Sequence, residues 1–208
     1  MTLRFRDVAT VSLYVGQEKA AFQVHMNLLC TISTFFKAAF SSEFSEAAEL
    51  SMHLEEDDVN TFERFVAWLY TKRYDLSCMG KDQRYMELAK LYVLADKYDV
   101  SRLKNGIIDQ LFELHEASCR PPSHHVVTYV YNNSTMKSSF RKLLVGWAAW
   151  HTDFGWFSKK STPECLLEIP EYAADLAIAL GKRLHIPARQ SPFTKERSFY
   201  YEDVKNGV

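Results

Sequence analysis

Hydrophobic and polar residues alternate over two short stretches near the start of the chain. Residues 11–15 read Val-Ser-Leu-Tyr-Val, and residues 22–24 read Phe-Gln-Val. A period of two is typical of a half-buried strand, because successive side chains of a strand point to opposite faces. The polar residues Gly16 to Lys19 lie between the two stretches. The pattern therefore predicts a β-hairpin.

From His25 the apolar positions recur every three or four residues, which predicts helices. Leu28 to Ile32 suit a short helix, and a second helix is expected over residues 35–40. Ser33 is placed to cap this second helix, because a serine hydroxyl can accept a hydrogen bond from a backbone N–H that has no partner within the helix.

Alternation returns at residues 50–54 and predicts a third strand. The carboxylates Glu55 to Asp58 follow it. They suit the electropositive start of a long helix, whose apolar stripe runs from Val59 to Tyr70. The same spacing predicts two more helices, over residues 85–95 and 103–114.

The segment Arg120 to Pro122 interrupts the helical pattern, because proline removes a backbone donor and restrains the residue before it. Beyond it, apolar spacing predicts helices over 126–131, 140–148 and 172–184. The composition turns polar and irregular after Pro187. We therefore expect three parts: a first domain over residues 8–118, a helical extension over 119–187 and a flexible tail over 188–208.

Composition adds that the chain can form a core and carries no excess of charge. Of its 208 residues, 47% are hydrophobic and 14% aromatic, and the net charge is −1. That balance argues against nucleic acid as a partner, because affinity for phosphates depends on dense Lys and Arg. No stretch approaches the ~20 apolar residues of a membrane span, and the start lacks the apolar core of a signal peptide. We expect a soluble protein of the cytoplasm or nucleus, without a membrane partner, whose four cysteines are free thiols.

Several motifs, taken in this order and spacing, resemble the BTB/POZ family. They are Val-Ser-Leu-Tyr-Val-Gly from Val11, Phe-Gln-Val-His from Phe22 with the Leu-Leu pair that ends at Leu29, Ser-Thr-Phe-Phe-Lys-Ala-Ala-Phe from Ser33, Glu-Phe-Ser-Glu from Glu43, and the segments Asp57–Thr71 and Leu91–Leu103. The motifs cover about the first half of the chain. Together with the trailing helices, they are most similar to the BTB proteins of filamentous fungi.

The resemblance implies an α+β fold, the BTB/POZ fold, in which helical hairpins flank a small three-stranded sheet, here followed by an all-helical extension. It also implies a surface for partner proteins. Family members form homodimers, bind a cullin scaffold as substrate adaptors of ubiquitin ligases, recruit transcriptional repressors or assemble ion channels. We therefore expect a protein-interaction module that is not an enzyme and needs no cofactor. Two functions stay open: a substrate adaptor for a cullin-type ubiquitin ligase, and a self-assembling scaffold or transcription-associated protein without a ligase role.

The candidate cullin-binding residues are Phe44 and Glu46. In cullin-binding members of the family, an apolar residue, any residue and a glutamate follow the second helix, and Phe44-Ser45-Glu46 matches this pattern. By the resemblance, Phe44 would contact the cullin and Glu46 would orient the loop. An apolar anchor is physically reasonable, because few residues carry most of the energy of an interface. The alternative is that Phe44 packs onto its own domain and Glu46 is solvated.

Histidines invite a catalytic or metal interpretation that the sequence does not favour. His25 matches the start of the family's first helix, where we expect it to bond to the backbone. His115, Cys119, His124 and His125 lie close in sequence, but structural zinc sites usually use paired ligands such as Cys-x-x-Cys. We expect no metal site. No Walker-type loop, Gly-x-Gly-x-x-Gly or Gly-x-Ser-x-Gly motif is present either.

The helical extension is rich in aromatic residues. They are Tyr129, Tyr131, Trp147, Trp150 and Trp156. Most are expected in its core, with one or two exposed for partner binding. Because no zinc finger or kelch repeat follows within the sequence, this extension, or a second chain, would have to hold a client protein.

Two features depart from the dimeric, repressor-recruiting branch of the family. Thr10 stands where many members have an aspartate that lines a charged pocket. The arm before the first strand offers only Leu3 and Phe5 as apolar residues for an exchanged strand. The sequence therefore leaves the homodimer, and the oligomeric state in general, open.

Overall fold

The computed structural model describes residues 9–41, 49–118, 122–151, 164–185 and 197–203. Its contacts divide the chain into two compact units. The first consists of Met1–Cys78, Lys90–Lys104 and Asp203–Val208, and the second of Met79–Ala89 and Asn105–Glu202. The helices α5 (Lys81–Lys97) and α6 (Ser101–Ser118) contribute residues to both units. The expected domain boundary at Arg120 lies outside the described residues.

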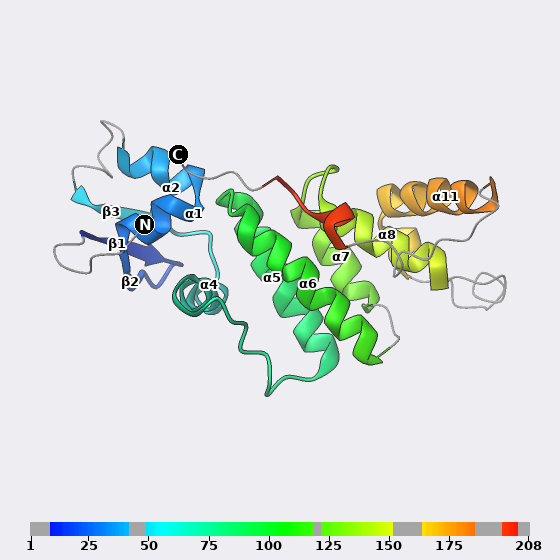
Figure 1. Cartoon of the computed structure of the whole chain (residues 1–208), viewed down its shortest axis with the longest axis horizontal. Coiled ribbons are helices and arrows are strands. Elements are labelled where there is room, and N and C mark those ends of the chain that lie inside the picture. The colour runs from blue at the N-terminus through cyan, green and yellow to red at the C-terminus, as the bar shows by residue number, and fades with distance from the viewer. Residues whose placement is uncertain (1–8, 42–48, 119–121, 152–163, 186–196, 204–208) are drawn as a thin grey trace. The chain divides into compact units, whose positions relative to one another are not determined.

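A three-stranded sheet of order β2-β1-β3 forms the base of the first unit (Figure 1). The strand β1 (Thr10–Val15) pairs antiparallel with β2 (Ala20–His25) and parallel with β3 (Ser51–Leu54). The alternation read from the sequence is confirmed, because one face of the sheet is buried. Its buried side chains are those of Val11, Leu13, Val15, Val24, Met52 and Leu54.

The hairpin between β1 and β2 depends on Gly16. Its φ angle is +71°, in the left-handed region that side chains with a Cβ rarely adopt. A Cβ at this position would also lie 3.0 Å from Val59 Cγ2 and 3.4 Å from the Asp57 carbonyl oxygen. Glycine is therefore required for two reasons. One is the left-handed turn, and the other is the close approach of Asp57 and Val59, where a later helix begins.

Three helices complete the core of the first unit together with α5. The helices α1 (Met26–Ile32) and α2 (Thr34–Ser41) pack against each other, and α1 also packs on β2. They precede β3, so they supply the long connection that a parallel strand pair requires. The helix α4 (Val59–Thr71) buries one stripe, which includes the predicted Phe62, Phe65 and Leu69, whereas Tyr70, also expected in it, is exposed. The buried residues of α4 are Thr61, Phe62, Phe65, Trp68 and Leu69.

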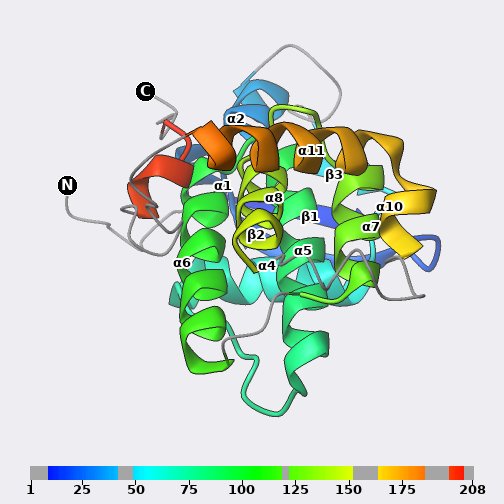
Figure 2. The same ribbon diagram turned by 90° about the vertical axis from the view of Figure 1, so that its right-hand side faces the viewer.

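The second unit is helical. It contains α7 (His124–Asn133), α8 (Ser139–His151), the short α10 (Glu164–Glu168), α11 (Pro170–His185) and the 3₁₀ turn η1 (Arg197–Tyr200). The helix α8 packs against α7 and α11, and Figure 2 shows α11 lying across it. Its buried side chains, which include Phe140, Leu143, Leu144 and Trp147, supply much of the core.

Two local features of the C-terminal part of the chain are the start of α11 and the segment Arg197–Tyr200. Pro170 is the first residue of α11, where its missing N–H would have no helical partner in any case. Within the tail expected over residues 188–208, Arg197–Tyr200 forms η1 and Tyr200 is buried. The Tyr200 ring contacts Phe112 of α6, a partner that a local pattern does not reveal. None of the described helices is long and apolar enough to cross a membrane.

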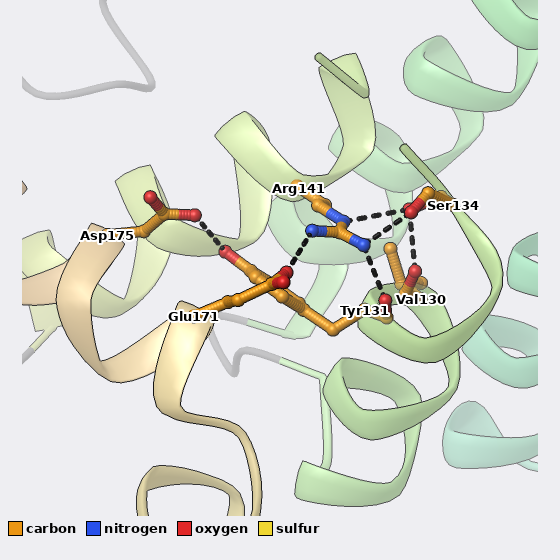
Figure 3. A network of polar contacts seen from close by, with 6 residues as sticks. All are labelled: Val130, Tyr131, Ser134, Arg141, Glu171 and Asp175. Atoms are coloured by element: carbon orange, nitrogen blue, oxygen red, sulfur yellow. Dashed lines mark hydrogen bonds and ion pairs between the residues drawn. The ribbon is translucent and has the colours of Figure 1, made fainter. Parts of the chain in front are cut away.

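A buried arginine ties three helices of the second unit together (Figure 3). The Arg141 side chain, on α8, is only 6% exposed. Its guanidinium donates to the carbonyl oxygens of Tyr131 and Ser134 and, through Nε at 3.1 Å, to the Ser134 hydroxyl. These carbonyls end α7 and have no partner within that helix. Arg141 therefore caps α7 from a neighbouring helix.

The same arginine reaches α11. Its Nη1 lies 2.8 Å from the Glu171 carboxylate, which is 61% exposed. Its Cζ lies 4.5 Å from the centre of the Tyr131 ring, a cation–π arrangement. The Tyr131 hydroxyl donates to Asp175 at 2.9 Å. Burial and the Asp175 carboxylate both raise the pKa of Tyr131, so its hydroxyl stays protonated and remains a donor.

We expect Arg141→Ala to lower the free energy of unfolding by about 2–3 kcal/mol, because it leaves buried carbonyl groups without their charged donor. Glu171→Gln should cost less than about 1 kcal/mol, because this carboxylate is mostly solvated. Urea unfolding followed by circular dichroism would measure both. Equal losses for the two variants would contradict the capping role of Arg141.

Candidate protein-interaction site

The two candidate cullin-binding residues, Phe44 and Glu46, lie outside the described residues. The helix α2 leads into their segment, and the chain is described again from Glu49. On the first side, Phe36 and Phe40 of α2 are buried. On the other side, Leu50 adopts a left-handed φ of 49°, and its carbonyl oxygen accepts a hydrogen bond from the Ser12 N–H at 2.9 Å. The described residues on both sides of the segment are thus fixed by packing or hydrogen bonding.

The start of α2 is fixed by Ser33, as the sequence predicts. Its hydroxyl accepts a hydrogen bond from the Phe36 N–H at 3.1 Å, which caps the helix. The same hydroxyl donates to the Tyr98 carbonyl oxygen at 2.6 Å. Beside it, the Thr34 hydroxyl donates to the Asp99 carboxylate. The α2 N-terminus is therefore fastened to the residues that follow α5.

Tyr98 is the residue to which these elements converge. Its buried ring stacks on Phe36, with centroids 4.7 Å apart and planes at 25°. The exposed ring of Phe35 lies 5.1 Å away at a tilt. Its hydroxyl donates to Asp57, in the turn before α4, and the Asp57 carboxylate also lies 2.8 Å from Lys97 Nζ. We call this group the Tyr98 hub: Ser33, Phe36, Asp57, Lys97 and Tyr98.

The electrostatics of the hub keep its hydrogen bonds in one arrangement. Burial first, and then the Asp57 carboxylate, raise the pKa of Tyr98 well above its ordinary value. The Tyr98 hydroxyl therefore stays protonated and donates, while the Asp57 carboxylate accepts from both Tyr98 and Lys97. This arrangement can orient α2.

The structure corrects the expectation that the whole run Glu55 to Asp58 opens a helix. Only Asp58 is the N-cap of α4, with its carboxylate accepting from the Thr61 N–H at 2.9 Å and from the Thr61 hydroxyl at 2.7 Å. These bonds hold the pKa of Asp58 below its ordinary value. Asp57 belongs to the Tyr98 hub instead. The pattern located the acidic cap correctly but could not show the long-range partner of Asp57.

A second correction concerns His25. It is the N-cap residue of α1, as expected, but its side chain makes no capping bond. Its Nδ1 lies 2.7 Å from the Tyr70 hydroxyl, which also accepts from the His25 N–H at 3.1 Å. The expected bond from the side chain to the backbone is therefore replaced by a bond to the hydroxyl of Tyr70, near the end of α4. A residue 45 positions away gave no local signal.

The histidines of the extension are only partly brought together. His115 Nε2, on α6, lies 3.3 Å from His151 Nε2, on α8, and the His115 ring stacks on Trp147. His124 and His125 contact each other in α7, and Cys119 lies outside the described residues. Within the described ranges, no three His, Cys, Asp or Glu residues are arranged to hold a metal ion.

The aromatic residues of the extension divide by burial. Trp147 and Tyr131 are buried, whereas Tyr129 and Trp150 are intermediate. Trp156 lies outside the described residues, as do Leu3 and Phe5 of the N-terminal arm. Thr10, at the exposed start of β1, is described.

We expect Tyr98→Phe to lower the free energy of unfolding by about 1–3 kcal/mol, because the buried Asp57 carboxylate loses a donor while the ring stack is kept. Tyr14→Phe is the control, since Tyr14 is half-exposed and stacks on His53. The control should change stability by less than about 0.5 kcal/mol. Chemical denaturation would compare the two, and a control effect as large as that of Tyr98→Phe would contradict the role of the hub.

The cap of α4 predicts a pH dependence. Because the pKa of Asp58 is lower in the folded state, its stabilisation is complete above the unfolded pKa of ~3.9 and is lost as pH falls through the folded pKa. Asp58→Ala should cost about 0.5–2 kcal/mol at pH 7. Asp58→Asn should retain most of the cap and lose this pH dependence. Unfolding curves would be measured between neutral and acid pH. If the assignment is mistaken, the difference in free energy of unfolding between wild type and Asp58→Asn would not change with pH.

Comparison with known proteins agrees with this architecture. The profile of the BTB/POZ domain matches residues 2–113, more than half of the chain. The search of curated proteins gave no match. The matched range includes the three-stranded sheet, α1, α2, α4, α5 and most of α6. The chain therefore belongs to the BTB/POZ family of protein-interaction domains.

Proposed function

We propose that this chain is a substrate adaptor for a cullin-type ubiquitin ligase. Phe44 docks the cullin, Glu46 orients the loop that carries Phe44, and the helical extension holds a client. The observation that carries the proposal is the Phe44-Ser45-Glu46 motif between α2 and β3 of a BTB/POZ domain. The action is non-covalent bridging, which requires two surfaces and no catalytic group.

The surroundings of the motif support an interface. A partner surface binds more tightly when its elements are ordered before binding, because less conformational entropy is lost. The Tyr98 hub fixes α2, and the Ser12–Leu50 hydrogen bond fixes the start of β3. Phe35 of α2, the helix that precedes the motif, is 41% exposed and can add apolar area to an interface. Aromatic residues are enriched at the cores of protein interfaces.

The extension supports the client role through its rigidity. Arg141 holds α7, α8 and α11 in one arrangement. Outside this network, the extension exposes apolar side chains. Among the described residues of the extension, the most exposed large apolar side chains are those of Met136, Leu167 and Ile178.

A binding assay with a purified BTB-binding cullin tests the proposal. Phe44→Asp with Glu46→Ala should weaken binding at least about 30-fold, the loss of one hot spot of ~2 kcal/mol. Leu167→Asp is the matched control: it places the same charge on an exposed position of the extension and should leave cullin binding unchanged.

Two outcomes would reject the adaptor role. One is a wild-type chain that does not bind the cullin, and the other is a double variant that binds as well as wild type. A wild-type chain that fails to bind the cullin but forms a dimer in light scattering across a concentration series would favour the scaffold function instead.

A further inference from the structure

The segment Arg197–Glu202 lies along one face of α6 and is described here as the strap. Figure 2 shows η1, the first part of the strap, beside α6. Its partners on α6 recur at helical spacing, so they share one side of that helix. They are Asn105, Asp109, Phe112, Glu113 and Glu116. All of these residues belong to the second unit.

One aromatic ring anchors the strap. Tyr200 is 3% exposed, and its ring centroid lies 5.8 Å from that of Phe112. Phe112 in turn meets the fully buried Trp147 edge-on, also at 5.8 Å. The neighbouring Phe199 is 63% exposed. The strap therefore inserts one aromatic side chain into the core and turns the next one outward.

One cation meets three carboxylates at the other end of the strap. The Arg197 guanidinium lies 3.3 Å from Glu116, 3.7 Å from Asp109 and 3.8 Å from Glu113. Its Cζ also lies 5.6 Å from the Phe112 ring centre. A single exposed ion pair contributes little. Three acids around one guanidinium, above an aromatic face, specify arginine at this position.

Asn105 recognises the backbone of the strap and not its side chains. Its Nδ2 donates to the Glu202 carbonyl oxygen, and its Oδ1 accepts from the Glu202 N–H, both at 2.9 Å. The Tyr201 hydroxyl donates to Asp109. Burial, together with the hydrogen bond to Asp109, raises the pKa of Tyr201 to about 12, so the hydroxyl remains a donor at physiological pH. Because the Asn105 amide bonds only to backbone atoms, it would accept any extended segment that carries suitable anchor side chains.

We propose that this face of α6 is a peptide-binding site that the strap occupies in cis, and that a partner protein competes for it. The partner segment carries an arginine, then, three residues later, two adjacent tyrosines, in the order in which Arg197, Tyr200 and Tyr201 stand here. The acidic row of α6 selects the arginine, the Phe112 ring selects the aromatic anchor, and Asn105 holds the backbone. The proposal does not depend on cullin binding.

The covalent link between the strap and its site determines how much the strap should weaken the binding of an added peptide. A segment on a short linker has an effective concentration of about 1 mM at its own site. If the free peptide binds with a Kd of about 0.1 mM, the strap is docked roughly ten times out of eleven. Added peptide then binds the wild-type chain about tenfold more weakly than a chain whose strap is weakened.

The test uses a fluorescent synthetic peptide with the sequence of residues 197–203 and the full chain, followed by anisotropy. Arg197→Ala with Tyr200→Ala should weaken the strap and bind the peptide about tenfold more tightly than wild type. Phe199→Ala is the matched control and should behave as wild type, because its ring is mostly exposed. Adding Asp109→Lys to the weakened chain should abolish binding, and raised salt should reduce it. Circular dichroism confirms that each variant is folded, and the single variant Arg197→Ala serves if the double variant is not.

Three results would overturn the proposal. The first is a folded, strap-weakened chain that does not bind the peptide. The second is equal binding by the wild-type and weakened chains, since the site would then not be occupied in cis. The third is a concentration-dependent dimer of the wild-type chain that Asp109→Lys abolishes, because the occupant would then be a second copy.

Discussion

The stack of Tyr98 on Phe36 is the contact on which the arrangement of the first unit depends. A buried aromatic ring contributes apolar area, but the polar atoms carried into the interior with it must find partners. Here each of them does: the Tyr98 carbonyl accepts from Ser33 and its hydroxyl donates to Asp57. Because Ser33 also caps α2 and Asp57 lies in the turn before α4, one ring sets the positions of two helix N-termini.

In the second unit, a charged side chain supplies the partners that buried polar groups require. The end of α7 presents carbonyl groups that its own helix cannot satisfy, and Arg141 supplies donors from α8. Burying a guanidinium is costly unless it is paired and bonded. Glu171 supplies the opposite charge, and the Tyr131 ring covers one face of the guanidinium. In both units, then, buried polar groups near a helix end are satisfied by side chains from another element.

This explains which features were predictable. The strands, the amphipathic helices and the caps at Ser33 and Asp58 were predictable, because each depends on residues within a few positions of one another. The partner of Asp57 lies 41 residues away, and the glutamate bound by Arg141 lies 30 residues away. Hydrophobic period carries no information on such pairs. For the candidate site, the motif around Phe44 was found by its resemblance to a family, whereas the support given to α2 by Tyr98 left no local signal.

The strap also depends on long-range contacts that a local sequence pattern does not predict. The tail after Pro187 has a polar and irregular pattern, which led to the expectation of a flexible segment. Yet one buried tyrosine and one arginine among three acids are enough to seat it on α6. Binding energy concentrated in two anchors is also how short segments recognise partner proteins. The strap occupies a site on one face of α6. The side chains of the strap therefore indicate which residues a partner segment would need to bind there.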